Sequence, residues 1–197
     1  MIQEFYKKIY THHEFYWAIF EAVRSFKYFS AARRKKLLSP KFIERIMLAV
    51  TEVNGCEVCS YAHTKMALEQ GMSAKEIKEI LSGETGNIPE DEAVAVMFSQ
   101  HYADQRGKPS AESWQRLVDQ YGEASAQGIL AAVRIMTMAN IYGIAFSAMR
   151  SRLKGKPVSK TSLLYEVSII LAIFIYLPIG VIHAVLANLK NEPLLKF

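Results

Sequence analysis

The chain is poor in cysteine, in strand signals and in charge of one sign. It has 197 residues but only two cysteines, Cys56 and Cys59, so a secreted scaffold held by several disulfides is excluded. It has no alternating run of β-branched residues, which argues against a sheet. The formal net charge is only +5, and the basic residues do not form the strong stripe that is typical of nucleic-acid binding. An all-α protein that binds no nucleic acid is therefore predicted.

The N-terminal stretch does not contain the continuous apolar core that is typical of a signal peptide. In a reducing compartment, a C-x-x-C pair is more often catalytic or metal-binding than structural. We therefore expect the globular part in the cytoplasm, with membrane association through the C-terminal apolar segment as an open alternative.

Helix start and stop signals are frequent along the chain. Ser39 and Pro40 indicate an N-cap followed by proline at the first helical position, and Asn54-Gly55 ends the helix that they begin. Ser73 indicates the N-cap of a later short helix. An aromatic-rich amphipathic helix is predicted over residues 3–30, and a long central helix over 124–153 after a break at Gly122. These signals predict an N-terminal helix (1–36), an all-α helical core (37–157) and an apolar C-terminal helix (158–197).

The C-terminal part contains a long apolar segment, residues 163–189. Its portion 167–187 has no aspartate, glutamate, lysine or arginine, and about 20 such residues match a hydrocarbon core of roughly 30 Å. Pro178 and Gly180 interrupt it, which membrane helices tolerate. Lysines flank it on both sides, so the distribution of charge favours neither orientation. The segment is predicted to span a membrane or to pack in an oligomer interface, kinked at Pro178.

The chemistry of the chain is concentrated between Gly55 and His63. Cys56 lies at the predicted start of a helix, where unpaired N–H groups and the helix dipole favour a thiolate. Cys56 and Cys59 are one turn apart and can close a disulfide with little backbone movement. His63 follows Cys59 at i+4, so its imidazole can accept the proton of that thiol. The pattern favours thiol–disulfide redox chemistry.

One carboxylate in the preceding helix is placed unusually. Glu44 lies among aliphatic residues of the helix predicted over 42–53. A charged side chain in such a place either reaches solvent or has a partner. If that helix packs antiparallel to the next, Glu44 reaches His63 and forms a Glu–His–Cys proton relay; a plain surface carboxylate is the alternative.

These residues resemble a known family. The stretch from Phe42 to Ala67 is similar to the alkylhydroperoxidase D-like (AhpD-like) proteins of the carboxymuconolactone decarboxylase superfamily, which carry a glutamate twelve residues before C-x-x-C-x-x-x-H. Glu44, Cys56, Cys59 and His63 match that pattern, and the resemblance extends over about residues 37–157.

The resemblance implies an all-α bundle that forms homo-oligomers and acts as a thiol-dependent peroxidase or disulfide reductase. In that scheme Cys59 attacks, Cys56 resolves, and His63 with Glu44 relays the proton. No tightly bound cofactor is implied; the substrate is a hydroperoxide or a disulfide, and a protein thiol or small dithiol reduces the pair. Val58 stands where well-characterised peroxidases carry a polar residue. The decarboxylase branch generally lacks the C-x-x-C, which argues against lactone decarboxylation.

Two other interpretations stay open at this point. Cys56, Cys59 and His63, with His101 or a water as fourth ligand, would make a zinc site, although structural zinc usually draws on a second ligand pair elsewhere. Alternatively, the chain is a non-enzymatic thiol sensor or a membrane-associated scaffold.

Overall fold

The computed structural model describes residues 4–84 and 86–197, and within them the chain folds into seven helices without a strand. The predicted all-α class is confirmed. The helices are α1 (His12–Arg34), α2 (Pro40–Asn54), α3 (Glu57–Glu69), α4 (Ala74–Leu81), α5 (Glu90–Asp104), α6 (Ala111–Leu153) and α7 (Leu163–Leu189).

The helix boundaries follow from local capping. Ser39 accepts a hydrogen bond from the backbone N–H of Phe42, and Ser73 caps α4 through the N–H of Glu76, both as predicted. The expected helix over residues 3–30 is wrong at both ends, because α1 runs from His12 to Arg34. Thr11 and Glu14 form a capping box that starts α1, and residues 4–10 are not helical. Residue 3 lies outside the described residues.

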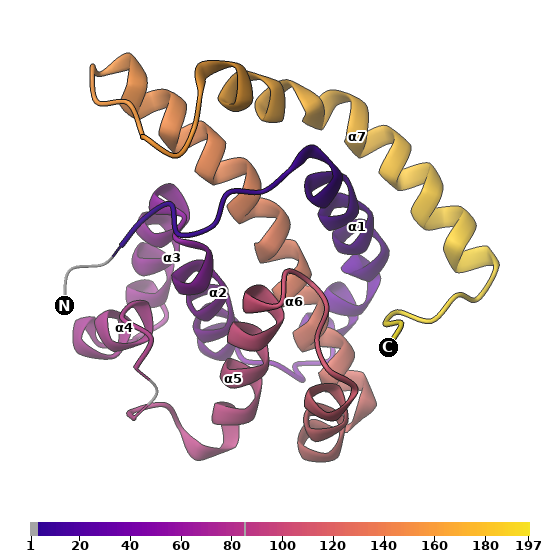
Figure 1. Ribbon diagram of the computed structural model, residues 1–197. Helices are drawn as coiled ribbons and strands as arrows, with labels where there is room; N and C mark the ends of the chain where they lie inside the picture. Colours follow the sequence, from indigo (N-terminus) through magenta and orange to yellow (C-terminus); the bar gives the residue numbers. More distant parts are fainter. Residues whose placement is uncertain (1–3, 85) are drawn as a thin grey trace.

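The long helix α6 is the centre of the molecule (Figure 1). Its apolar middle is fully buried, with Ile129, Leu130 and Val133 at 0% exposure, and it contacts α1, α2, α3, α5 and α7. At Gly122 the backbone leaves the helical region (φ 73°, ψ 158°), which confirms the predicted break. The central helix therefore reaches both the two cysteines and the apolar C-terminal helix.

Helices α2 to α5 form one side of the molecule against α6 (Figure 1). The buried Arg45 of α2 joins them, since its guanidinium lies 2.6 Å from a carboxylate oxygen of Glu76 on α4 and 2.6 Å from one of Glu92 on α5. Burial raises the pKa of Glu92, although Arg45 opposes that rise. These ion pairs hold α2 against α4 and α5.

Helix α7 lies along the opposite side, next to α1 and α6 (Figure 1). Its small residues Ala172, Gly180 and Ala184 face inward. A Cβ atom at Gly180 would lie 3.0 Å from Cγ2 of Ile19, so the absence of a side chain there allows α1 and α7 to approach closely. The helix is long and apolar enough to cross a membrane by length and composition, as is α6, whose apolar stretch is mostly buried in the core.

Candidate redox site

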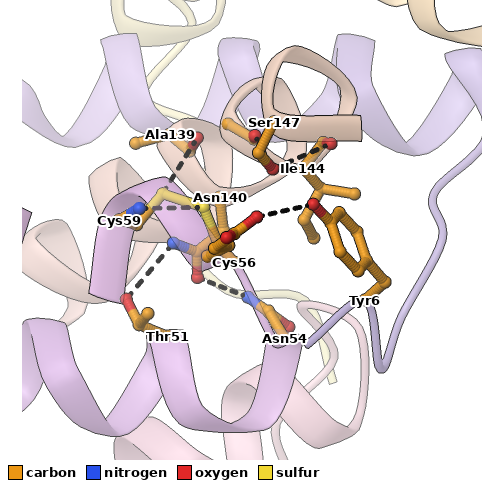
Figure 2. The surroundings of a disulfide bond; sticks show 11 residues. Tyr6, Thr51, Asn54, Cys56, Cys59, Ala139, Asn140, Ile144 and Ser147 are labelled. Carbon is orange, nitrogen blue, oxygen red and sulfur yellow. Dashed lines mark hydrogen bonds between the residues drawn. A yellow bond between two sulfur atoms is a disulfide. The ribbon is translucent and has the colours of Figure 1, made fainter. Parts of the chain in front are cut away.

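The two cysteines are joined at the start of α3. Cys56 is the N-cap residue, Cys59 lies in the first turn, and their sulfur atoms form a disulfide with the Cα atoms 5.3 Å apart (Figure 2). The backbone N–H of Cys59 points at the sulfur of Cys56, at 3.3 Å. The helix terminus therefore supplies a positive environment to the Cys56 sulfur, which favours its thiolate when the bond is reduced.

The turn that delivers Cys56 requires glycine. Gly55 has a φ of 71°, a conformation that other residues adopt only with strain. A Cβ atom at this position would lie 2.6 Å from the backbone nitrogen of Lys7. The N-terminal segment crosses here, because the N–H of Tyr6 donates to the carbonyl oxygen of Gly55 at 2.7 Å. Gly55 thus serves both the turn and the passage of the chain over it.

The two sulfur atoms differ in exposure. Cys56 is fully buried, whereas Cys59 is 8% exposed. Cys59 opens into a pocket of about 310 Å³, here called the sulfur pocket. Its lining residues are Val58, Cys59, Ala62, His63, Met136, Ala139, Tyr142, Gly143 and Phe146. A molecule in this pocket meets Cys59 before Cys56.

His63 and Glu44 lie together beside this pocket. Nδ1 of His63 is 2.8 Å from Oε2 of Glu44, and their side chains are only 16% and 12% exposed. The carboxylate thus holds one ring nitrogen, leaving the other to act on a group in the pocket. The structure brings together all four residues that the sequence singled out: Glu44 on α2, and Cys56, Cys59 and His63 at the start of α3 or within it.

Helix α6 forms the floor under the sulfur atoms. A Cβ atom at Gly143 would lie 2.7 Å from both the Cys56 and the Cys59 sulfur. The carbonyl oxygen of Ala139 is 3.8 Å from the Cys59 sulfur (Figure 2). Sequence reasoning missed Gly143, because its role depends on α6 crossing α3 far along the chain. The only available signal was a glycine inside a long apolar helix.

A buried polar network fixes the turn between α2 and α3. The phenol of Tyr10 donates to Oδ1 of Asn54 at 2.6 Å. Nδ2 of Asn54 donates to Asn140, and Nδ2 of Asn140 donates to Thr51 at 3.2 Å (Figure 2). Asn54, Thr51 and Asn140 are fully buried. Buried polar groups of this kind are costly unless paired, so the network sets the relative positions of α2 and α6.

Tyr6 closes the outer side of the turn. Its hydroxyl donates to Oε2 of Glu57 at 2.8 Å (Figure 2). Burial raises the pKa of Tyr6 to about 12, with the Glu57 carboxylate adding to the rise, so the phenol stays protonated and keeps donating at neutral pH. Neither Tyr6 nor Tyr10 could be assigned to this region from the sequence, since both precede it by more than 40 residues.

A cationic depression adjoins the sulfur pocket and shares Val58 and Phe146 with it. We call it the basic groove; its lining residues are Glu57, Val58, Tyr61, Phe146, Ser147, Arg150, Ser151, Lys154 and Lys156. Arg150, Lys154 and Lys156 have no ion-pair partner among the described residues. The approach to Cys59 is therefore apolar near the sulfur and positively charged farther out.

The zinc interpretation finds no cluster to support it. Within residues 4–84 and 86–197, no group of three or more histidine, cysteine, aspartate or glutamate side chains is placed to hold a metal ion. His101, the suggested fourth ligand, lies at the end of α5, where its Nε2 accepts a hydrogen bond from the N–H of Ser110.

The disulfide, His63 and Glu44 all lie in a segment of the chain that matches a known protein family. Residues 18–85 match the carboxymuconolactone decarboxylase family. This family contains the AhpD-like proteins, so the resemblance inferred from the motif is confirmed for this segment. The carboxymuconolactone decarboxylase family includes both decarboxylases and peroxidases.

The match to the carboxymuconolactone decarboxylase family covers about a third of the chain. It starts inside α1, which the sequence had assigned to a separate N-terminal part, and it contains all four motif residues. It ends before α5 and α6, so the resemblance expected for residues 86–157 stays a prediction. A search of curated proteins and a search of solved structures gave no match.

Proposed function

We propose that this protein is a thiol-dependent peroxidase in which Cys59 attacks, Cys56 resolves, and Glu44 and His63 move the proton. The observation that carries the proposal is the joint position of Cys59 and His63 on one pocket, with Glu44 held 2.8 Å from the far side of the imidazole. A nucleophile, a base and a group that orients the base are the recurring parts of activated thiol sites.

The unequal burial of the two sulfur atoms supports this division of roles. Cys59 is the sulfur on the pocket, so a peroxide reaches it first. Cys56 is closed off but lies within bonding distance of Cys59, which is what a resolving thiol needs. A nucleophile exposed to substrate and a resolver shielded from it reduce the loss of thiols to side reactions.

In the proposed cycle, one hydroperoxide oxidises the two thiols to a disulfide, and an external dithiol reduces them again. His63 takes the proton of the Cys59 thiol, and the thiolate attacks the outer oxygen of a hydroperoxide ROOH, breaking the O–O bond. The leaving alkoxide takes a proton and departs as ROH, while Cys59 becomes a sulfenic acid. The Cys56 thiol displaces the sulfenic hydroxyl as water and forms the disulfide. An external dithiol supplies two electrons and two protons to restore both thiols.

The surroundings of Cys59 favour an organic hydroperoxide over hydrogen peroxide. Val58, Ala62, Met136 and Phe146 make the sulfur pocket apolar, and burying the alkyl part of a substrate there stabilises binding. The basic groove beyond Phe146 suits an anionic group at the far end of the substrate or on the reducing dithiol. The identity of the reductant, assembly into a homo-oligomer and a cytoplasmic location stay predictions.

The proposal is tested by turnover of the reduced protein with tert-butyl hydroperoxide and dithiothreitol. We expect catalytic peroxide consumption in the parent, none in Cys59→Ser, and accumulation of a sulfenic acid on Cys59 in Cys56→Ser, detected by dimedone labelling and mass spectrometry. Turnover in Cys59→Ser equal to that of the parent would overturn the assignment.

A redox sensor gives a different result in the same assay. Such a protein forms its disulfide once per molecule, and dithiothreitol does not sustain peroxide consumption above the rate of dithiothreitol alone. A cleaved disulfide substrate with no peroxide consumption would instead place the protein among the disulfide reductases.

A further inference from the structure

The outward face of α7 is apolar along its whole length. Leu164, Leu171, Phe174, Ile182 and Leu189 are each more than half exposed, and they span nearly the full helix. Between Leu163 and Leu189, no exposed side chain is polar or charged. An exposed apolar patch of this extent on a soluble protein marks a surface that is covered in use.

The polar side chains of α7 are all turned inward and paired. Ser168 and Tyr176 hydrogen-bond to the His12 ring at 2.9 and 3.3 Å, and Nδ1 of His183 lies 3.0 Å from the hydroxyl of Tyr16. The remaining three groups are bound in the same way: Tyr165 to the carbonyl oxygen of Tyr10, Glu166 to Arg152, and Asn188 to Arg24. The rotation of α7 is therefore set by contacts with the core, which leave only carbon on the outside.

The start of α7 is tied to the globular body. The guanidinium of Arg152, at the end of α6, donates two hydrogen bonds to the carboxylate of Glu166, at 2.8 and 2.7 Å. The hydroxyl of Tyr165 donates to the carbonyl oxygen of Tyr10 at 2.9 Å.

The end of α7 is tied to the same body. The chain after it returns to α1 and α6, where Arg24 donates to the carbonyl oxygens of Glu192 and Pro193 and Arg134 donates to that of Leu194 at 2.6 Å. Arg24 and Arg134 are only 5% and 2% exposed, so these contacts are inside the protein.

These two attachments disfavour the crossing that the sequence allowed. A helix of 27 residues is about 40 Å long, longer than a hydrocarbon core of roughly 30 Å, so its ends would lie on opposite sides of a membrane. Both ends are bound to one body, and that body includes α1 with Arg24 and Glu21, so crossing would place these charges in hydrocarbon. With both ends bound in this way, the helix meets a membrane along its side.

The charges around α7 fit the same orientation. Lys154, Lys156 and Lys160 precede the helix, and Lys190 and Lys196 follow it. Cations at both ends give no orientation to a crossing helix, but a helix lying in the plane of the membrane brings both ends to the headgroups. Lys160 and Lys196 are paired with Glu4 and Glu192, whereas Lys154, Lys156 and Lys190 have no ion-pair partner among the described residues. These three unpaired cations lie on both sides of the helix in the chain and complement anionic lipid.

The composition of the face distinguishes lipid from a second copy of the chain. Protein interfaces are enriched in aromatic residues, methionine and arginine, and carry about one hydrogen bond per 100–200 Å². The outward face of α7 offers leucine, isoleucine and valine with one phenylalanine and one proline, and no hydrogen-bonding side chain. We propose that α7 docks this face into one leaflet of an anionic membrane, in the plane of the surface, while its inner face stays on the core. The proposal is independent of the peroxidase activity.

Vesicle binding tests the docking. The full chain is mixed with vesicles of phosphatidylcholine containing 30% phosphatidylglycerol, and bound protein is measured by flotation. We expect the parent to bind these vesicles, and to bind less when salt is added or when the vesicles contain phosphatidylcholine alone. Binding should drop at least tenfold in the variant Ile175→Glu/Ile182→Glu. Leu68→Glu, at a similarly exposed apolar position on α3, is the matched control and is expected to bind as the parent does. Equal binding of the double variant and the parent would overturn the proposal.

Solution size and labelling separate the other two arrangements. If a second copy covers α7, the protein sediments as a dimer that Ile175→Glu/Ile182→Glu dissociates, and it does not bind vesicles; this result overturns the proposal. For orientation, Lys160→Cys and Lys196→Cys are made one at a time in a Cys56→Ser/Cys59→Ser background and treated with an impermeant maleimide outside the vesicles. Labelling of both positions supports docking in the plane, and labelling of only one shows a crossing.

Discussion

Replacing Glu44 by glutamine removes the charge behind His63 while keeping the size and hydrogen-bonding capacity of the side chain. Oε2 of Glu44 lies 2.8 Å from Nδ1 of His63, and both side chains are less than one-fifth exposed, so solvent screens the pair weakly. When His63 takes the proton of Cys59, the ring becomes an imidazolium that the carboxylate stabilises. Glutamine cannot stabilise that charge to the same extent.

The expected loss follows from the strength of this contact. A hydrogen bond to a charged group contributes about 1.5–3 kcal/mol, and each 1.36 kcal/mol corresponds to a tenfold change in rate. Oxidation of the reduced Glu44→Gln protein by tert-butyl hydroperoxide should therefore be about 10- to 150-fold slower than that of the parent. This range does not exceed the contribution of roughly 10²–10⁴ assigned to a general base as a whole, as expected for a residue that acts through the base.

The assay is a rapid-quench measurement of disulfide formation between Cys56 and Cys59, read by alkylation and mass spectrometry. Glu69→Gln is the matched control, because it removes an exposed carboxylate from the end of α3. In the Glu44→Gln/His63→Gln double variant, the rate should equal that of His63→Gln alone, since the carboxylate acts through the imidazole. A Glu44→Gln protein that keeps the parent rate, with an unchanged helical signal in circular dichroism, would refute the relay.

Three further changes test the supports of the site and of α7. Gly143→Ala should lower the free energy of unfolding of the oxidised protein in urea by up to about 2 kcal/mol, because crowding against both sulfurs costs about 1–3 kcal/mol and the helix-propensity gain is about 1 kcal/mol; an increase would contradict the contact. Asn140→Ala leaves Asn54 without one partner and should lower the free energy of unfolding by about 1–3 kcal/mol in the same measurement. An unchanged free energy of unfolding would show that the network does not stabilise the fold. The hydrogen bonds from Arg152 hold the pKa of Glu166 below its usual range, so this pair stabilises the fold above the ordinary glutamate pKa and loses that contribution as the pH falls through the lowered value. Thermal unfolding of Glu166→Gln should accordingly start from a lower midpoint at neutral pH and fall less steeply than the parent below about pH 4; parallel acid profiles would argue against the linkage.

The helices and the motif could be predicted from the sequence because their causes are local. Caps such as Ser39 and Ser73 act on the next three residues, so their effect does not depend on the rest of the fold. The first helix was wrong at both ends, and the larger error, at its start, came from extending an aromatic pattern through residues 4–10. That segment instead pairs with the turn at Gly55, a contact between distant parts of the chain that periodicity does not encode.

The part of the site that α6 supplies could not be predicted from the sequence, because it also depends on a contact between distant parts of the chain. Gly143 and Asn140 lie more than 80 residues after the cysteines, and only the crossing of α6 beneath α3 makes them part of the site. Glu44 was an intermediate case: periodicity alone placed it on the surface, the family resemblance implied a partner, and the packing of α2 against α3 brings it to His63.

By itself, the sequence determined that this protein is helical, that Cys56, Cys59 and His63 share one face of a helix as candidate reactive groups, and that one long C-terminal segment is apolar. These properties follow from residue type and from spacings of three or four residues within one helix. Only the tertiary structure decided that Cys59 opens to a pocket while Cys56 is buried, and that α7 has both ends bound to the core. Burial and attachment depend on which distant surfaces meet, and the free energy that selects those contacts comes from packing over the whole molecule.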